Sequence, residues 1–402
     1  MLRKITYESK KILINKHVLL FVGAVVFIAA TLRAPLTSVG PVISFIRDDL
    51  GISNTLAGLL TTIPLLAFAL ISPFAPKAAR KFGMEWTLFY SIILLAMGIA
   101  FRSYGNTSML LLGTVMIGIA IAFGNVLMPS LFKLRFPLHI GLLTAIYSVS
   151  MNLSSGLSAG ISYPITNTKF GWQGGLAVSI IITFIALLLL LPQLKGNKVA
   201  LSTNSERKLG WGIFIRSKIA WAVMLAMGLQ SFVFYSTAAW IPEIYVSQGL
   251  EAQNAGWLVS VMQISQIPLT FITPIIASKL KDQRPIFIVF TAFYLIGFIG
   301  MIMEWTDYAI LWMMFIGFAG GSSFSLVMVL FNLRTKTAYE AAELSGFAQS
   351  LGYLFAATGP ACFGLLKDIT GSFFVPNIIF IFIAISLLCA GMIAGQNKYV
   401  RE

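Results

Sequence analysis

The sequence predicts an all-α polytopic membrane protein with twelve transmembrane helices. Of its 402 residues, 58% are hydrophobic and only 10% are charged, whereas a soluble domain carries roughly 25% charged residues. So few charged side chains cannot cover a globule in water, and 32 Phe with 8 Trp exclude disorder because their apolar area requires burial. The apolar residues also fall into twelve runs, each near the roughly 20 residues that a helix needs to cross a bilayer.

The twelve runs follow one another with short connections. Lys10, Lys11 and Lys16 precede the first run, as basic residues precede the core of a secretory signal peptide. That run nevertheless continues past Arg33 to Ile46, and eleven more follow, so we expect it to be a retained helix. The predicted spans are 18–46, 55–76, 86–101, 110–132, 140–163, 172–192, 219–246, 255–278, 285–303, 309–331, 344–366 and 374–395.

The distribution of cations predicts that both termini are cytoplasmic. With the N-terminus inside, 23 of the 28 Lys and Arg residues fall in inner segments and Arg33 falls within the bilayer. Cytoplasmic loops carry such an excess. The net charge of +14 is therefore explained by orientation in a membrane, and we expect no nucleic-acid partner. The cations that remain for the outer loops are Arg47, Arg102, Lys169 and Lys367.

A polar stretch over residues 195–218 carries six cations and divides the chain into two halves. We expect an N-terminal six-helix bundle over 1–194, a cytoplasmic linker over 195–218 and a C-terminal six-helix bundle over 219–402. The halves resemble each other weakly, since Ala57-Gly58-Leu59-Leu60 opens the second span and Ala255-Gly256-Trp257-Leu258 the eighth. A parallel repeat of six helices is typical of the major facilitator superfamily, whose substrate cavity lies at the midplane between the halves.

Arg33 is the most informative single residue, because it falls near the centre of the first span. A charge there costs about 2.5–3.5 kcal/mol on the insertion scale. One explanation is a side chain that reaches the headgroups or bonds to free carbonyls beside Pro35; the headgroups are out of reach from mid-span. No Asp or Glu falls deep in any span as a permanent partner. We therefore predict that Arg33 holds an anionic or strongly polar substrate in a bidentate fork.

Other polar and aromatic side chains share helix faces that could line the same cavity, although neutral amides also hold packed helices together. All acidic residues can be placed in loops or near helix ends, so we expect no midplane carboxylate to carry a coupling proton. Among these acidic residues Glu243 is the gating candidate. The substrate-binding candidates besides Arg33 are Thr37, Asn125, Tyr147, Asn152, Gln230, Tyr235, Trp240, Gln263, Gln266, Gln349 and Tyr353.

Gly156-Leu157-Ser158-Ala159-Gly160 matches the Gly-x-Ser-x-Gly pattern of serine hydrolases. That pattern requires a strand-to-helix turn and a nearby histidine, but here it lies in an apolar helix, and His17 and His139 are at helix ends. The glycines fit a close-packing helix face instead. Cys362 and Cys389 lack metal-ligand spacing, and no P-loop, dinucleotide or zincin motif is present. We expect no enzyme activity, cofactor or metal.

Several segments, in order along the chain, carry a family resemblance. They are Leu32-Arg33-Ala34-Pro35 with Gly40-Pro41, the run from Gly58 to Phe68, Gly124 to Pro129, Gly228-Leu229-Gln230-Ser231 through Tyr235 to Pro242, and Leu344 to Tyr353 leading to Gly359-Pro360. With these segments the chain resembles the cyanate permease and 2-nitroimidazole transporter family (CynX/NimT) of the major facilitator superfamily. The resemblance implies transport of a small anion or small polar aromatic compound. The loop over residues 76–83 lacks the aspartate usual in the superfamily, so its usual salt-bridge latch is not predicted.

We therefore expect a monomeric secondary active or facilitative transporter of a small anion or small polar compound, working by alternating access in the bacterial cytoplasmic membrane. One alternative is a multidrug-type exporter of hydrophobic compounds, because 16 Met and 32 Phe could line an adaptable cavity. Another is a membrane receptor without transport. A receptor would need a sizeable soluble output domain, and no predicted loop exceeds about 25 residues.

Overall fold

The protein is built from membrane-length α-helices in the part of the chain that the computed structural model describes, residues 16–195 and 211–401. Within those ranges, eleven helical segments are long and apolar enough to cross a membrane. The twelfth predicted span, 344–366, falls on α17 (Ala338–Ala356) and α18 (Thr358–Thr370), which meet at Ala357. The predicted all-helical polytopic fold is confirmed.

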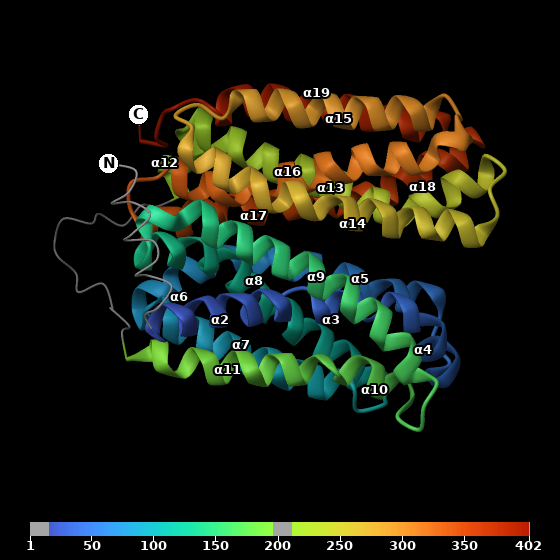
Figure 1. Ribbon diagram of the computed structural model, residues 1–402. Coiled ribbons are helices and arrows are strands. Elements are labelled where there is room, and N and C mark those ends of the chain that lie inside the picture. Colours follow the sequence, from blue (N-terminus) through green and yellow to red (C-terminus); the bar gives the residue numbers. More distant parts are fainter. Residues whose placement is uncertain (1–15, 196–210, 402) are drawn as a thin grey trace.

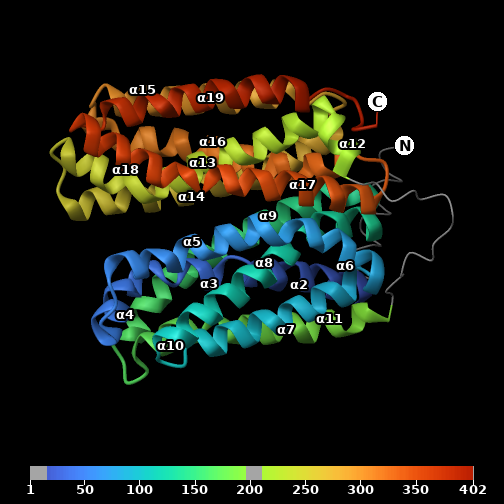
Figure 2. The same ribbon diagram turned by 180° about the vertical axis from the view of Figure 1, so that it is seen from behind.

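The helices form two bundles that lie side by side (Figure 1 and Figure 2). The first contains α2 (Lys16–Thr31), α3 (Ala34–Thr37), η1 (Gly40–Val42), α4 (Ile43–Leu50), α5 (Asn54–Ile71), η2 (Ser72–Phe74), α6 (Ala75–Phe82), α7 (Met84–Arg102), α8 (Thr107–Arg135), η3 (Pro137–His139), α9 (Ile140–Thr166), α10 (Gly171–Ala177) and α11 (Ser179–Leu194). The second contains α12 (Trp211–Arg216), α13 (Lys218–Ser247), α14 (Ala252–Lys279), α15 (Arg284–Ile302), η4 (Thr306–Tyr308), α16 (Ala309–Leu333), α17, α18 and α19 (Phe374–Ala394). We call the side on which α2 begins and α19 ends the inner side, which the sequence predicts to be cytoplasmic, and the opposite side the outer side.

The first span is broken rather than continuous. The helix α2 ends at Thr31 and α3 begins at Ala34, so that Leu32 and Arg33 lie between two helical segments. Pro35 has no N–H group and cannot bond to the carbonyl of Thr31 four residues earlier. The predicted span over 18–46 therefore contains an interruption in mid-membrane, and Arg33 lies at that interruption.

Glycines in α16 fix its contact with α14. A Cβ atom added at Gly317 would lie 2.4 Å from the carbonyl oxygen of Met262, and one at Gly321 would lie 2.3 Å from that of Gln266. No larger residue fits at either position, so the two helices approach closely only because these residues are glycine. This contact holds Gln266 in place on the wall of the second bundle.

The two bundles are joined on the inner side by hydrogen bonds from α17 to backbone carbonyls of the first bundle. Ser350 Oγ donates to the Ala69 carbonyl at 2.6 Å, and Gln349 Nε2 donates to the Asn125 carbonyl at 3.0 Å. A proline four residues ahead leaves a helix carbonyl without its usual N–H partner. Each accepting carbonyl lies four residues before such a proline: Pro73 and Pro129.

Charged side chains add to this inner contact. Arg80, in the predicted loop over residues 76–83, most of which forms α6, makes an ion pair with Glu343 of α17 in the second bundle. Lys133 Nζ donates to the Asn332 carbonyl at 2.7 Å and to the Thr335 carbonyl, at the end of α16. The loop therefore takes part in a latch between the bundles although it lacks the usual aspartate.

The bundles diverge toward the outer ends of α5 and α14 (Figure 1 and Figure 2). A Cβ atom added at any of four glycines in the outer halves of α5, α9 and α14 would meet no heavy atom within 4 Å. These glycines are Gly58, Gly156, Gly160 and Gly256. Contact on the inner side together with open space on the outer side is an outward-facing arrangement of the two bundles.

Candidate substrate site

The guanidinium group of Arg33 lies between two phenyl rings of the other bundle. Its Cζ atom is 5.1 Å from the ring centroid of Phe234 in α13 and 5.4 Å from that of Phe324 in α16. Both distances allow attraction between a cation and an aromatic face. Across residues 16–195 and 211–401, no ion pair involves Arg33, and its side chain donates no hydrogen bond to the protein. Its N–H donors are therefore available to a ligand.

A small pocket of about 10 Å³ surrounds Arg33 at the interface of the two bundles. This volume holds about one water molecule, so a ligand would have to displace the side chains that line the pocket. A second pocket, also of about 10 Å³, shares Gln230, Phe234 and Gln266 with the first and continues to Tyr294. The wall of the first pocket consists of Arg33 and Asn152 from the first bundle and Gln230, Ser231, Phe234, Tyr235, Gln266, Phe324 and Tyr353 from the second.

Three amide side chains of the pocket use their nitrogen atoms within the protein. Asn152 Nδ2 donates to Thr270 Oγ1 at 3.2 Å. Gln266 Nε2 donates to Gln263 Oε1 at 2.6 Å, and Gln230 Nε2 donates to a neighbouring hydroxyl at 2.6 Å. The amide oxygens of the three pocket residues accept no hydrogen bond from the described residues. The pocket thus combines the donors of one guanidinium with several amide acceptors.

The comparison with known proteins agrees with this architecture. A family model for the Major Facilitator Superfamily matches residues 19–360. The chain belongs to the major facilitator superfamily. The proton:xylose symporter XylE, solved with 6-bromo-6-deoxy-D-glucose, shares this fold with a TM-score of 0.76 over 95% of this chain and 98% of XylE, at 15% identity.

Full-length relatives place the chain in the CynX/NimT family of this superfamily. It is 43% identical to "Uncharacterized transporter YycB" of Bacillus subtilis over 96% of both chains. It is 36% identical to the "2-nitroimidazole transporter" of Escherichia coli, over 96% of this chain and 98% of the relative. It is 26% identical to the "Cyanate transport protein CynX" of Escherichia coli, over 87% of this chain and 90% of the relative. These relatives are transporters and not enzymes.

Six of the twelve residues predicted for the site lie on the pocket wall of this transporter: Arg33, Asn152, Gln230, Tyr235, Gln266 and Tyr353. The other six predicted residues are engaged elsewhere. Thr37 donates to the Ser155 carbonyl at 3.1 Å, and Trp240 Nε1 donates to the Pro360 carbonyl at 2.9 Å. Gln263 does not line the pocket but accepts the hydrogen bond from Gln266 that is described above.

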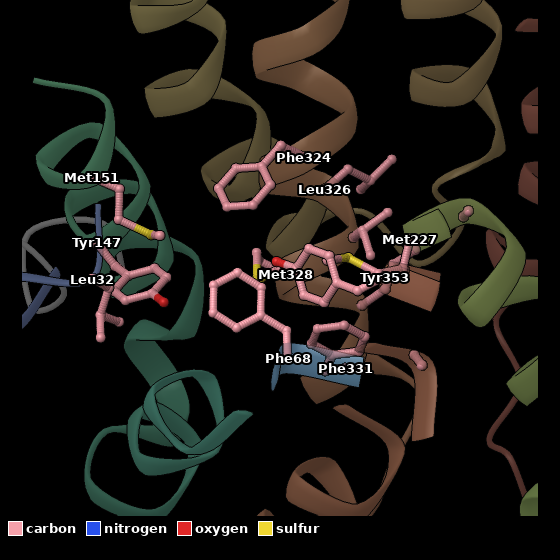
Figure 3. Packing of buried hydrophobic residues seen from close by; sticks show 14 of the residues in the cluster. Leu32, Phe68, Tyr147, Met151, Met227, Phe324, Leu326, Met328, Phe331 and Tyr353 are labelled. Atoms are coloured by element: carbon pink, nitrogen blue, oxygen red, sulfur yellow. The ribbon is translucent and has the colours of Figure 1, made fainter. Parts of the chain in front are cut away.

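Asn125, Tyr147 and Gln349 form a buried group at the inner contact and do not line the pocket. Tyr147 Oη donates to Asn125 Oδ1 at 3.3 Å, and Gln349 donates to the backbone of the same asparagine. In Figure 3 the rings of Phe68 and Tyr353 lie between Phe324 and Phe331, and the ring centroids of the first two are 5.1 Å apart. Because Phe68 and Tyr353 belong to different bundles, this pair adds an aromatic contact between the bundles beside the pocket.

Three residues that line the pocket were not predicted from the sequence: Ser231, Phe234 and Phe324. Phe234 lies four residues after Gln230 and so shares its helix face, which is a usable signal. Phe324 carries no such signal, because one phenylalanine in an apolar helix is indistinguishable from its neighbours. Glu243, the gating candidate, pairs with Lys367 of the same bundle at 3.3 Å on the outer side.

The acidic residues of the described chain lie at helix ends or in loops, and none lines either pocket. Within residues 16–195 and 211–401, no group of three or more His, Cys, Asp or Glu is arranged to hold a metal ion. Arg102, which the sequence analysis placed in an outer loop, is instead buried at the end of α7, with 1% of its surface exposed.

Proposed function

We propose that this protein is a secondary transporter for a compact, planar, polar or anionic molecule, with Arg33 as its main substrate contact. The observation that carries the proposal is the unpaired Arg33 guanidinium held between Phe234 and Phe324 at the bundle interface. A half-buried cation within a membrane span, without a protein counter-ion among the described residues, is costly. A ligand that accepts hydrogen bonds from this cation, and lies against the same rings, would offset that cost.

The pocket's acceptors narrow the substrate class. A ligand that carries an N–H or O–H group can donate to the amide oxygens of Asn152, Gln230 and Gln266 while an acceptor group binds Arg33. The relatives named for 2-nitroimidazole and cyanate support this class. 2-Nitroimidazole has both a ring N–H and nitro oxygens, whereas cyanate offers acceptors and a charge. The polar wall favours such ligands over hydrophobic drugs.

We further propose that the bundles over residues 1–194 and 219–402 move as units about the site, with the linker over 195–218 between them. Arg33 belongs to one bundle and its two rings to the other, so a ligand at Arg33 can couple binding to their relative motion. We propose the bacterial cytoplasmic membrane as the location and a monomer as the working unit. The bacterial relatives and the inner excess of cations support this assignment.

Among the residues that the structure describes, no acidic side chain lines the pocket, and we propose that no carboxylate of the protein carries a coupling proton at the midplane. Transport then proceeds by facilitated diffusion, by exchange, or with a proton carried on the substrate as its neutral acid. Proton relays are usually built from buried Asp, Glu or His.

Flux into proteoliposomes tests the proposed function. We expect saturable uptake of radiolabelled 2-nitroimidazole that excess unlabelled 2-nitroimidazole or cyanate inhibits, with no uptake of a lipophilic cation. Empty liposomes and liposomes with the Arg33→Gln variant serve as controls. Uptake of the lipophilic cation alone would show a multidrug-type exporter, and binding without any flux would show a receptor.

A further inference from the structure

We propose that Arg102 is a positioning residue, which holds the interruption of the first span so that Arg33 points into the pocket. Its Nη1 atom donates to the Pro35 carbonyl at 2.6 Å, and its Nη2 atom lies 3.4 Å from the hydroxyl of Ser38. That hydroxyl donates to the same Pro35 carbonyl at 3.2 Å. The role rests on the proposed function of Arg33 as the substrate contact.

The position of Arg102 is costly without such a role. The side chain is buried, with 1% of its surface exposed, and the described residues place no carboxylate next to it. Helical side chains lean toward the N-terminus of their helix, so a guanidinium attached at the outer end of α7 reaches back into the membrane. A charged donor kept in this environment is best explained by backbone carbonyls that need one.

The end of α3, directly after the interruption, provides such a carbonyl. The Pro35 carbonyl lies near the end of α3, where the chain passes into η1 and the regular helical ladder stops. Arg102 supplies a donor for this carbonyl. Ser158 Oγ of α9 donates at 2.8 Å to the Ala34 carbonyl, which also accepts the backbone N–H of Ser38. The segment that follows Arg33 is thus held from two helices.

Close packing of α8 against the end of α7 fixes the position of the Arg102 backbone. A Cβ atom added at Gly113 of α8 would lie 2.4 Å from the backbone nitrogen of Arg102, so only glycine permits α8 to lie this near the end of α7. The backbone of Arg102 is therefore held in place against α8. A positioning residue requires such a fixed backbone, because its side chain must reach the same acceptors each time.

Hydrogen–deuterium exchange of the purified protein tests the proposal without any ligand. In Arg102→Met the amides of Leu36, Thr37 and Ser38 should exchange at least about tenfold faster than in the parent, because loss of a charged hydrogen bond corresponds to about that factor. Arg102→Lys should be intermediate, since a point charge replaces only part of the fork. Binding of 2-nitroimidazole, measured in parallel by calorimetry, should weaken in the same order.

Arg334→Lys is the matched control. Arg334 is also buried, with 2% of its surface exposed, and donates to the carbonyls of Ala394 at 2.7 Å and Gly395 at 3.1 Å on the inner side. Its replacement should lower the melting temperature without changing exchange at residues 36–38 or ligand binding. If Arg102→Met lowers the melting temperature but leaves exchange at these amides unchanged, Arg102 merely stabilises a helix end and the proposal is wrong.

Two other outcomes, an Arg102→Met variant that does not fold and a parent protein that does not bind 2-nitroimidazole, also allow the proposal to be tested. If Arg102→Met does not fold, Ser38→Ala removes one of its two acceptors, and faster exchange at Leu36 and Thr37 is still expected. Unchanged exchange in Ser38→Ala would overturn the proposal in that case. If 2-nitroimidazole does not bind the parent protein, the proposed substrate class is wrong, whereas the exchange rates still decide the role of Arg102.

Discussion

Replacement of Arg33 by glutamine is expected to abolish high-affinity binding while leaving the fold intact. The Arg33 side chain makes no hydrogen bond to the described protein residues, so its removal breaks no structural bond. Two charge-assisted hydrogen bonds to a ligand contribute about 1.5–3 kcal/mol each. Their joint loss is about 3–6 kcal/mol, and since about 1.4 kcal/mol changes Kd tenfold, Kd should rise at least about a hundredfold.

The stability of the variant should change little. Loss of the attraction to Phe234 and Phe324 costs about 0.5–2 kcal/mol for each ring. Loss of the charge removes its desolvation cost of about 2.5–3.5 kcal/mol, which is of similar size and opposite sign. We expect the melting temperature of Arg33→Gln to stay close to that of the parent.

Calorimetry with 2-nitroimidazole on purified protein measures the effect. Arg33→Lys should retain some affinity, because it keeps the charge but not the planar fork. The control is Arg47→Gln, in the same span, where Arg47 pairs with Asp48 at 3.0 Å and its side chain is 42% exposed. Parent-like affinity in Arg33→Gln, or an equal loss in Arg47→Gln, would refute the reasoning.

Three further predictions concern the pocket, the latch and the coupling. Gln266→Ala should weaken 2-nitroimidazole binding by about 1–3 kcal/mol by calorimetry, because it removes an amide acceptor of the pocket; unchanged affinity would place the ligand elsewhere. Glu343→Gln breaks the ion pair with Arg80, so the equilibrium should shift toward the inward-facing state by about 1–3 kcal/mol, the cost of leaving a partly buried group without its partner. Labelling of introduced inner-side cysteines should be faster in this variant than in the parent. An unchanged labelling rate would exclude a role for the latch. A pH gradient should not drive uphill accumulation of a non-titrating anion, and accumulation that is present in the parent and lost in Glu243→Gln would show that a carboxylate couples transport.

The fold could be predicted largely from sequence because the bilayer imposes a length on each apolar run and the loops carry the charge asymmetry. The interruption at Leu32 and Arg33 is harder to predict. Pro35 signals a kink, but prolines also occur within α5 and α8, which continue through Pro64 and Pro129. Whether a proline ends a helix depends on what satisfies the freed carbonyls, and that depends on neighbouring helices.

The site could be predicted in part for a similar reason. Arg33 stands out because a charge in an apolar span is costly wherever it lies. Phe324 does not, because its role comes from its place opposite Arg33, and the interface of the two bundles decides that place. Arg102 was assigned to a loop because it ends its apolar run, and only the side chain's direction reveals that it lies inside.

The Ala69 and Asn125 carbonyls, four residues before Pro73 and Pro129, make separation of the two bundles on the inner side a hydration step. While the bundles are joined, Ser350 and Gln349 occupy these acceptors. When the bundles part, each acceptor must take a water molecule in place of a side chain, because its own helix has no N–H to offer. Opening therefore takes up water, and its equilibrium depends on water activity. An excluded osmolyte at high concentration should hold the protein in the outward-facing state, and Pro129→Ala, which returns an N–H to the Asn125 carbonyl, should reduce that sensitivity.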